Sequence, residues 1–239
     1  MVTGGARGIG AAITGILTAR GVRVTVLSRT PQTLDVPCDT VSADVADPEA
    51  VAQAFRLATD RSGPIHILVN NAGQAASAPF LKTGSELWRQ MMAVNVDGVF
   101  HCTQAALPGM LAAGWGRIVN VASTAGLTGY AYVSAYCAAK HAVIGLTRAL
   151  ALELASKGIT VNAVCPGYTA SDMTQQTIEN IVAKTGRSAE QAVAALVEHN
   201  PQKRLIDPEE VASAVAWLCL LESQAITGQA IAVAGGEIM

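Results

Sequence analysis

The sequence predicts an α/β fold in which helices cover both faces of a doubly wound parallel sheet. Strand-like and helix-like segments alternate along almost all of the 239 residues, as expected of repeated βαβ units. Hydrophobic residues make up 51% of the chain and aromatic residues only 4%, so small side chains that allow helices to pack closely on a sheet dominate the predicted core. Length alone allows one domain or two, and the absence of a linker favours a single domain over residues 1–239.

The first βαβ unit contains a glycine-rich turn. A strand at residues 1–3 leads into Thr3-Gly-Gly-Ala-Arg-Gly-Ile-Gly10, a helical pattern over 11–20 stops at Gly21, and a second strand covers 22–28. The glycines allow close backbone approach, and the free N–H groups at the helix start favour a phosphate. The spacing differs from the common Gly-x-Gly-x-x-Gly pattern, so a plain turn is the alternative interpretation of the motif taken alone.

The remaining strands are predicted near residues 40–43, 65–70, 116–122, 159–165 and 229–233. Residues 169–204 interrupt the alternation with two helical patterns, 172–185 and 188–200, separated at Gly186. Long insertions in compact domains are commonly functional, although a helical pair that only packs on the surface is the alternative. A first strand of about three residues is short for the centre of a sheet, so we expect the natural polypeptide to begin upstream of Met1.

Three residues have the chemistry of a proton-transfer site. Tyr136 and Lys140 lie four apart in a helical pattern and therefore share a face, where the ammonium is expected to lower the pKa of the phenol. Ser123 ends the apolar run that begins at Gly116, at the strand end that borders a ligand crevice. Tyr136 is therefore a candidate general acid or base, and the Ser123 hydroxyl is placed to hold the reacting oxygen.

With these motifs, the chain resembles the classical short-chain dehydrogenase/reductase family over essentially its whole length. The glycine turn, Asn70-Asn71-Ala72-Gly73, Asn95, Ser123, Tyr136, Lys140 and Pro166-Gly167 occur in the order and spacing of that family. The resemblance implies a single-domain, Rossmann-like doubly wound parallel sheet in which residues 169–204 form a helical substrate lid. It also implies reversible hydride transfer between a nicotinamide and a secondary alcohol or ketone.

The same resemblance assigns roles to particular residues. It implies that Tyr136 is the acid/base, that Lys140 lowers its pKa and holds the nicotinamide ribose, that Ser123 binds the substrate oxygen and that Asn95 holds a relay water. The cofactor contacts that we expect from the resemblance and the glycine turn, besides Tyr136 and Lys140, are Gly4, Arg7, Gly8, Ile9, Gly10, Ser28, Arg29, Asp44, Val45, Asn71, Ala72, Gly73, Pro166, Gly167, Thr169 and Ser171. At position 171 the family usually has Thr, and Ser171 keeps the hydroxyl.

The end of the second strand favours NADP(H) over NAD(H). An acidic residue there would bind the ribose hydroxyls and repel a 2′-phosphate, but this chain has Ser28 followed by Arg29. Arg7 in the glycine turn is a second guanidinium expected near the phosphate. Two solvated surface arginines are the alternative, so NAD(H) stays possible.

The substrate is expected to be a 3-oxoacyl thioester or a neutral ketone. The 169–204 segment looks similar to that of D-3-hydroxybutyrate dehydrogenases, but the His and Lys with which those enzymes hold a free carboxylate are replaced by Ala125 and Val133. Basic residues of the segment are candidates for the phosphates of an acyl carrier, with plain solvation as the alternative: Lys184, Arg187, Lys203 and Arg204. The alternatives for the whole chain are an NAD-dependent 3-hydroxyacid or other alcohol dehydrogenase, and a non-catalytic dinucleotide-sensing protein. A sugar-nucleotide epimerase or dehydratase is disfavoured by the short chain and by the Gly8-Ile9-Gly10 ending.

Composition argues against several other classes. A formal net charge of −2 without a basic block argues against nucleic acid, and no apolar run approaches the length of a membrane span. The five cysteines and four histidines lack metal-ligand spacing, so we expect no metal and a reduced, cytoplasmic protein. Both 94–113 and 134–155 carry more apolar surface than a one-sided helix needs, and together with the resemblance this predicts a homotetramer.

Overall fold

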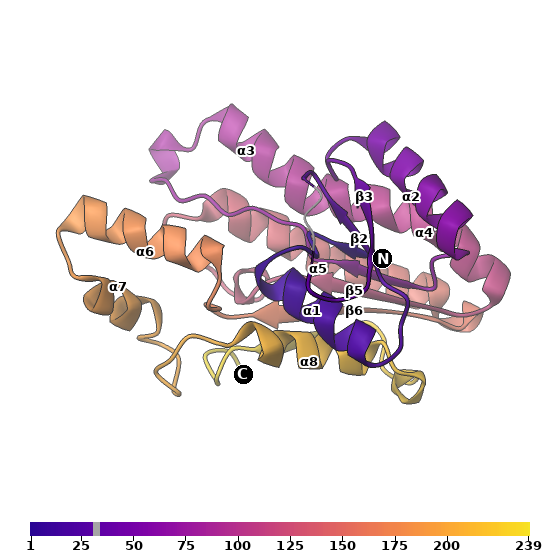
Figure 1. The fold of residues 1–239 in the computed structure, drawn as a ribbon. Helices are drawn as coiled ribbons and strands as arrows, with labels where there is room; N and C mark the ends of the chain where they lie inside the picture. Colours follow the sequence, from indigo (N-terminus) through magenta and orange to yellow (C-terminus); the bar gives the residue numbers. More distant parts are fainter. Residues whose placement is uncertain (31–33) are drawn as a thin grey trace.

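The computed structural model describes residues 1–30 and 34–239 and contains, within them, a seven-stranded parallel sheet flanked by helices (Figure 1). The strand order is β3-β2-β1-β4-β5-β6-β7. The strands are β1 (Val2–Thr3), β2 (Thr25–Ser28), β3 (Asp39–Ser42), β4 (Ile67–Asn70), β5 (Gly116–Val121), β6 (Ile159–Pro166) and β7 (Ala230–Val233). The predicted doubly wound sheet is confirmed, and the order changes direction between β1 and β4. In such sheets the ligand crevice lies outside the carboxyl ends of the strands at this point.

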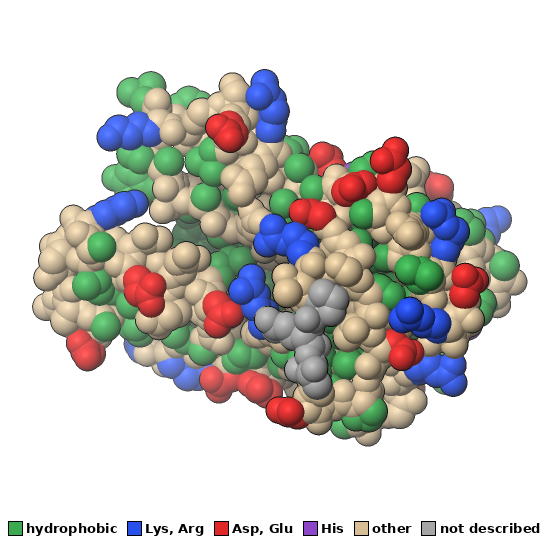
Figure 2. Space-filling view, turned by 45° about the horizontal axis from the view of Figure 1, so that its top comes forward, with side chains coloured by type: hydrophobic (Ala, Val, Ile, Leu, Met, Phe, Trp, Pro, Cys, Tyr) green, Lys and Arg blue, Asp and Glu red, His purple; other side chains and the backbone are tan. Residues whose placement is uncertain are grey.

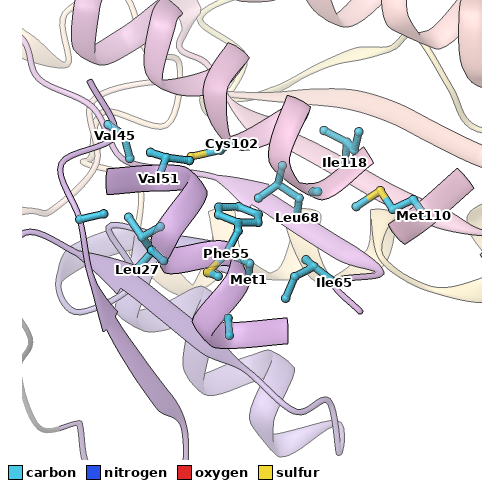
Figure 3. Close-up of a cluster of buried hydrophobic side chains, with 14 of the residues drawn as sticks. Met1, Leu27, Val45, Val51, Phe55, Ile65, Leu68, Cys102, Met110 and Ile118 are labelled. Carbon is cyan, nitrogen blue, oxygen red and sulfur yellow. The ribbon is translucent and has the colours of Figure 1, made fainter. Parts of the chain in front are cut away.

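Two apolar layers hold helices against the sheet. On one face, α1 (Gly8–Ala19) and α8 (Pro208–Leu218) pack together, and Ile13 and Val215 are fully buried there. On the other face lie α2 (Pro48–Ser62), α4 (Gly98–Ala113) and α5 (Ser134–Leu154). Figure 3 shows Phe55 of α2 near Leu68 of β4 in this second layer. Burial of these side chains positions the ends of the strands, where the polar motifs lie.

The 169–204 segment forms two helices that project beyond the main body, orange in Figure 1. The first, α6 (Asp172–Thr185), has Ser171 as its N-cap and ends at Gly186 with φ +70°. The second, α7 (Ala189–Leu196), begins with a capping box between Ser188 and Gln191. It is shorter than the predicted 188–200, because the chain turns at 197–200 with a hydrogen bond of 3.1 Å from the Asn200 amide to the Val197 carbonyl.

The helical region before α4 contains an irregular turn. The chain continues from α3 (Ser85–Met92) through a π-helical turn (Ala93–Asp97) directly into α4. A predicted helix over 94–113 is therefore divided into two kinds of helix. Single π-helical turns add one residue to the turn and re-aim side chains, and they occur often at functional sites.

The amino end of the chain lies inside the sheet. Val2 is in register with Val26 of β2 and Val69 of β4, and the Met1 amino group donates a hydrogen bond of 2.8 Å to the Ile67 carbonyl. The expectation of residues upstream of Met1 stays a prediction. In residues 1–30 and 34–239, no helix combines the length and apolarity needed to cross a membrane, and no cluster of three or more His, Cys, Asp or Glu side chains suits a metal ion. All five cysteines are free, and Cys102, Cys165 and Cys219 are buried.

Candidate active site

The glycine turn forms an open backbone cradle at the start of α1. Gly4 and Gly8 have φ values of +63° and +51°, which glycine adopts without strain. A Cβ on Gly10 would lie 2.1 Å from the Gly4 carbonyl oxygen, so no side chain fits there. The N-cap, Arg7, caps the helix with no side-chain hydrogen bond in the described chain. The first N–H groups of α1 are thus available to an anion, and the turn fits the phosphates of a dinucleotide.

The end of β4 is fixed to this turn by a residue that we did not single out from the sequence. The Thr3 hydroxyl accepts hydrogen bonds from the amides of Asn71 (3.0 Å) and Ala72 (2.9 Å). The Asn71 side chain in turn donates to the carbonyls of Thr3 (3.0 Å) and Gly4 (3.2 Å). Asn71, Ala72 and the glycine turn therefore form one rigid wall.

Asn95 lies in the π-helical turn and is fully buried. Its side-chain amide donates to the carbonyls of Gln74 (2.9 Å) and Met91 (3.0 Å), and its oxygen accepts from the Gln74 amide (3.2 Å). A Cβ on Gly73 would lie 2.9 Å from the Asn95 oxygen and 3.6 Å from Lys140 Nζ. Gly73 therefore fits between these two side chains, and Gln74 fixes the Asn95 side chain. Gln74 was not predicted as a site residue, and the only sequence signal for it is its position directly after Asn-Asn-Ala-Gly.

Ser123, Tyr136 and Lys140 meet at the carboxyl end of β5. Lys140 Nζ, buried in α5, donates a hydrogen bond of 3.0 Å to the Val121 carbonyl and lies 5.6 Å from the centre of the Tyr136 ring. Ser123 comes two residues after the end of β5, and its hydroxyl accepts from the Ala125 amide at 3.1 Å. The structure thus brings together all four residues predicted as catalytic.

The structure does not show the expected lowering of the Tyr136 pKa by Lys140. Burial raises the pKa of Tyr136 to about 12, and the neighbouring Ser123 hydroxyl opposes the rise. The Lys140 ammonium donates to the Val121 carbonyl and lies 5.6 Å from the centre of the Tyr136 ring. Burial also lowers the pKa of Lys140 itself, to about 8. At neutral pH the pair therefore consists of a neutral phenol and a mostly charged ammonium.

The predicted 2′-phosphate residues lie near the ends of β2 and the glycine turn. Ser28 ends β2, and its hydroxyl donates to the Thr30 carbonyl at 2.9 Å. Arg29 is exposed, whereas Arg7 forms an ion pair of 3.7 Å with Asp172 in the first turn of α6. This contact was not predicted from sequence, and a phosphate that bound Arg7 would compete with Asp172.

The other predicted cofactor residues lie at the same edge of the sheet. The Asp44 carboxylate accepts from the Ala46 amide (3.0 Å), and Val45 is buried against Gly98. Beyond β6, the Thr169 hydroxyl donates to the Gly167 carbonyl at 3.0 Å. Ser171 caps α6 and lies 3.6 Å from the position of a Cβ on Gly8. Pro166 ends β6, and Ile9 packs half-buried against the layer of α1 and α8.

The molecular surface is hollowed beside the helices of the 169–204 segment. Figure 2 shows this hollow between the part formed by α6 and α7 and the part that contains α3.

Three further polar side chains lie beyond Ser123 that sequence reasoning missed: Tyr130, Tyr168 and Glu237. Glu237 is 107 residues from Tyr130 in the chain, so no local pattern could have linked them.

The comparisons with known proteins agree with this geometry. The family model described as short chain dehydrogenase matches residues 1–182. The chain is 37% identical to a 3-oxoacyl-acyl-carrier-protein reductase of Vibrio cholerae, covering 100% of this chain and 96% of the relative. It is 34% identical to a D-beta-hydroxybutyrate dehydrogenase of Rhizobium meliloti, covering 99% and 96%. A crystal structure of an actinorhodin polyketide ketoreductase variant with NADPH superimposes with a TM-score of 0.94 at 38% identity, covering 99% of this chain and 95% of that one.

Proposed function

Because the chain belongs to the short-chain dehydrogenase family, we propose that it is an NADP(H)-dependent ketoreductase acting on a 3-oxoacyl thioester or a neutral ketone. The observation that carries this proposal is the convergence of Ser123, Tyr136 and Lys140 beside the glycine turn. The hydride would come from the nicotinamide when the cofactor is bound. The protein contributes orientation and proton transfer.

Each catalytic residue has a separate role in this proposal. In the direction of reduction, the substrate carbonyl oxygen lies between the hydroxyls of Ser123 and Tyr136, and Tyr136 donates the proton that converts it to an alcohol. Burial keeps the Tyr136 phenol protonated at neutral pH, which is the form that a proton donor needs. The Lys140 ammonium offsets negative charge that develops on the oxygen. Asn95, fixed by Gln74, orders the relay that returns a proton to the site.

The cofactor is held by the cradle and its neighbours. The pyrophosphate binds the N–H groups at the start of α1, where Gly4, Gly8 and Gly10 leave room for it. The 2′-phosphate of NADP(H) binds near Ser28 and Arg29, since no carboxylate stands at the end of β2 to repel it. Residues 169–204 close over the bound substrate as a lid, and the whole chain, 1–239, acts as one catalytic domain.

The neutral substrate follows from what surrounds Ser123. Ala125 and Val133 occupy the positions of the His and Lys with which D-3-hydroxybutyrate dehydrogenases hold a free carboxylate, and neither carries a charge. An NAD-dependent 3-hydroxyacid dehydrogenase is the second candidate, favoured by the 34% identical D-beta-hydroxybutyrate dehydrogenase. A non-catalytic dinucleotide-sensing protein is the third.

A panel of ketones, 3-oxo esters, 3-oxoacyl thioesters and 3-oxo acids, each with NADPH and with NADH, tests the proposal. We expect NADPH oxidation with a neutral 3-oxo ester or thioester. Faster turnover of 3-hydroxy acids with NAD would favour the second candidate. Cofactor binding without any turnover would favour the third.

We further propose that the protein is a cytoplasmic homotetramer. Large apolar side chains are exposed on the two long helices, notably Phe100 of α4 (45% exposed) and Leu152 of α5 (86% exposed). Pairing of these helices with those of another copy would remove this surface from water.

A further inference from the structure

A polar cluster next to Ser123 has no part in the chemistry proposed above. It consists of Thr124, Tyr130 and Glu237. The Tyr130 hydroxyl lies 2.9 Å from the Thr124 hydroxyl oxygen and 2.6 Å from a carboxylate oxygen of Glu237. The ring of Tyr168 packs edge-on against Tyr130, with 6.5 Å between the ring centres. Thr124 is buried, and Tyr130 and Glu237 are half-buried.

The hydrogen bonds in this cluster have one consistent direction. A phenol has a single proton, and the shorter contact, to the carboxylate, is the one that this proton makes. Tyr130 therefore donates to Glu237 and accepts from the Thr124 hydroxyl. The second oxygen of Glu237 lies 3.1 Å from the position of a Cβ on Gly167, at the carboxyl end of β6. In the part of the chain that the structure describes, no Lys, Arg or His forms an ion pair with Glu237.

The strand order places this carboxylate at the same edge of the sheet as Ser123. Thr124 follows Ser123 beyond β5, Gly167 follows β6, and Glu237 comes four residues after β7 ends at Val233. These strands are neighbours, with Val121 paired to Val164 and Pro166 paired to Val233. Two strand spacings amount to about 10 Å. Tyr168 is close enough to both groups to interact electrostatically, because it raises the pKa of Tyr136 and its own pKa is raised by Glu237.

We propose that Glu237 is a specificity determinant that rejects substrates with a free carboxylate. This inference rests on the proposed function and adds the reason for a neutral substrate. A 3-oxo acid held by its ketone at Ser123 and Tyr136 would bring a second negative charge towards Glu237, which no Lys, Arg or His of the described residues neutralises in an ion pair. Like charges repel strongly in a partly desolvated site. A 3-oxo ester or thioester carries no such charge, so it can bind in the active site without this repulsion.

The test compares acetoacetate with methyl acetoacetate, using NADPH and the full-length enzyme. We expect Glu237→Gln to raise the ratio of kcat/KM for the acid to that for the ester by about 10-fold or more. Added salt should raise the acid turnover of the wild type, by screening the repulsion, and should leave the ratio of the Gln variant unchanged. If Glu237 has only a structural role, the Gln variant should lower kcat/KM for both substrates in proportion. An unchanged ratio of the two kcat/KM values overturns the proposal.

Two variants separate charge from loss of a contact. Tyr130→Phe removes the hydrogen bond to Glu237 and keeps the charge of the Glu237 carboxylate. The ratio of kcat/KM for the acid to that for the ester should therefore stay as low as in the wild type. Glu222→Gln makes the same substitution at an exposed site in the turn after α8, and its ratio should equal that of the wild type. A Tyr130→Phe ratio as high as that of Glu237→Gln would assign the effect to packing.

A binding experiment keeps this inference separate from the proposed function. The dissociation constants of acetoacetate and methyl acetoacetate are measured for the NADPH complexes of the wild type and Glu237→Gln. If no ketone is reduced, the proposed function fails. Tighter binding of acetoacetate to Glu237→Gln than to the wild type would still support Glu237 as the specificity determinant. If ketones are reduced but Glu237→Gln changes neither the ratio of kcat/KM values nor the ratio of dissociation constants, the proposed role of Glu237 is wrong and the proposed function is retained.

Discussion

Lys140 of α5 donates a hydrogen bond of 3.0 Å to the carbonyl oxygen of Val121, the last residue of β5. This contact ties the helix that carries Tyr136 to the strand that leads to Ser123. The same Nζ lies 5.6 Å from the centre of the Tyr136 ring. The catalytic residues are thus assembled at one place, with a neutral phenol whose pKa is raised by burial.

Replacing Tyr136 by Phe should lower kcat by about 100-fold or more, because the proton donor is lost while the packing of the ring is kept. NADPH affinity, measured by fluorescence titration, should stay close to that of the wild type. Tyr132→Phe removes an exposed hydroxyl just before α5, the helix that contains Tyr136, and serves as the control. More than about a tenth of the wild-type rate in Tyr136→Phe would contradict the assigned role, since general acid loss costs more.

Lys140 should make the stability of the protein depend on pH in an unusual direction. Burial lowers its pKa from 10.5 to about 8, so between these values the unfolded chain holds a proton that the folded chain has released. The free energy of unfolding should therefore rise from pH 8 to pH 10.5 relative to Lys140→Met, by on the order of 1–3 kcal/mol. Urea denaturation at both pH values measures this difference, with Lys184→Met as a control at an exposed site. A difference that falls with pH would contradict the burial argument.

Arg29→Ala should weaken NADPH by about 10- to 100-fold and leave NADH nearly unchanged, because a charge-assisted contact to the 2′-phosphate is lost. Ser28→Asp should shift preference towards NADH by repelling that phosphate. Titration of both cofactors measures the effect. Arg23→Ala, at the other end of β2, is a control that also removes one positive charge. Equal losses for the two cofactors in Arg29→Ala would place Arg29 outside the phosphate site.

Arg204 and Glu210 tie the end of the 169–204 segment to α8. The guanidinium makes hydrogen bonds of 2.6 and 2.7 Å to the two Glu210 oxygens, and this lowers the pKa of Glu210 to about 2. The stability that the pair adds is therefore present above about pH 4.5 and is lost as pH falls towards 2. Arg204→Ala should lower Tm by at most about 4 °C at pH 7, since the pair is exposed. Arg187→Ala is the exposed control, and an equal Tm loss at pH 2 and pH 7 would contradict the ionic origin.

The proposed tetramer predicts that Leu152→Asp lowers the molar mass in solution, because a charge would be buried where an apolar side chain now meets another copy. Light scattering at micromolar concentration measures the mass. Leu221→Asp, at a side chain that is 69% exposed outside the two long helices, should leave it unchanged. A wild-type monomer would rule out the assembly.

The alternation of strands and helices, the glycine turn and the Tyr136–Lys140 spacing could be predicted from sequence because each rests on a local pattern, whereas Asn95 and most of the expected cofactor contacts came from the resemblance to the family. Apolar runs predict strands, and glycines at 4, 8 and 10 predict a turn, since both depend only on neighbouring residues. The spacing of Tyr136 and Lys140 likewise defines a helix face. The structure contains these elements because the local sequence preferences agree with the overall fold.

Tertiary structure alone decided three features of the site. The π-helical turn that buries Asn95 against Gln74 depends on packing between α3, α4 and the loop after β4. The pKa of Tyr136 depends on how deeply it is buried, which reversed the direction expected from its neighbour Lys140. The contact of Tyr130 with Glu237 joins residues that are far apart in the chain, and only the parallel order of β5, β6 and β7 brings them to one edge of the sheet. Sequence therefore determined which groups are present, whereas the sheet order and burial determined which of them meet and in what charge state.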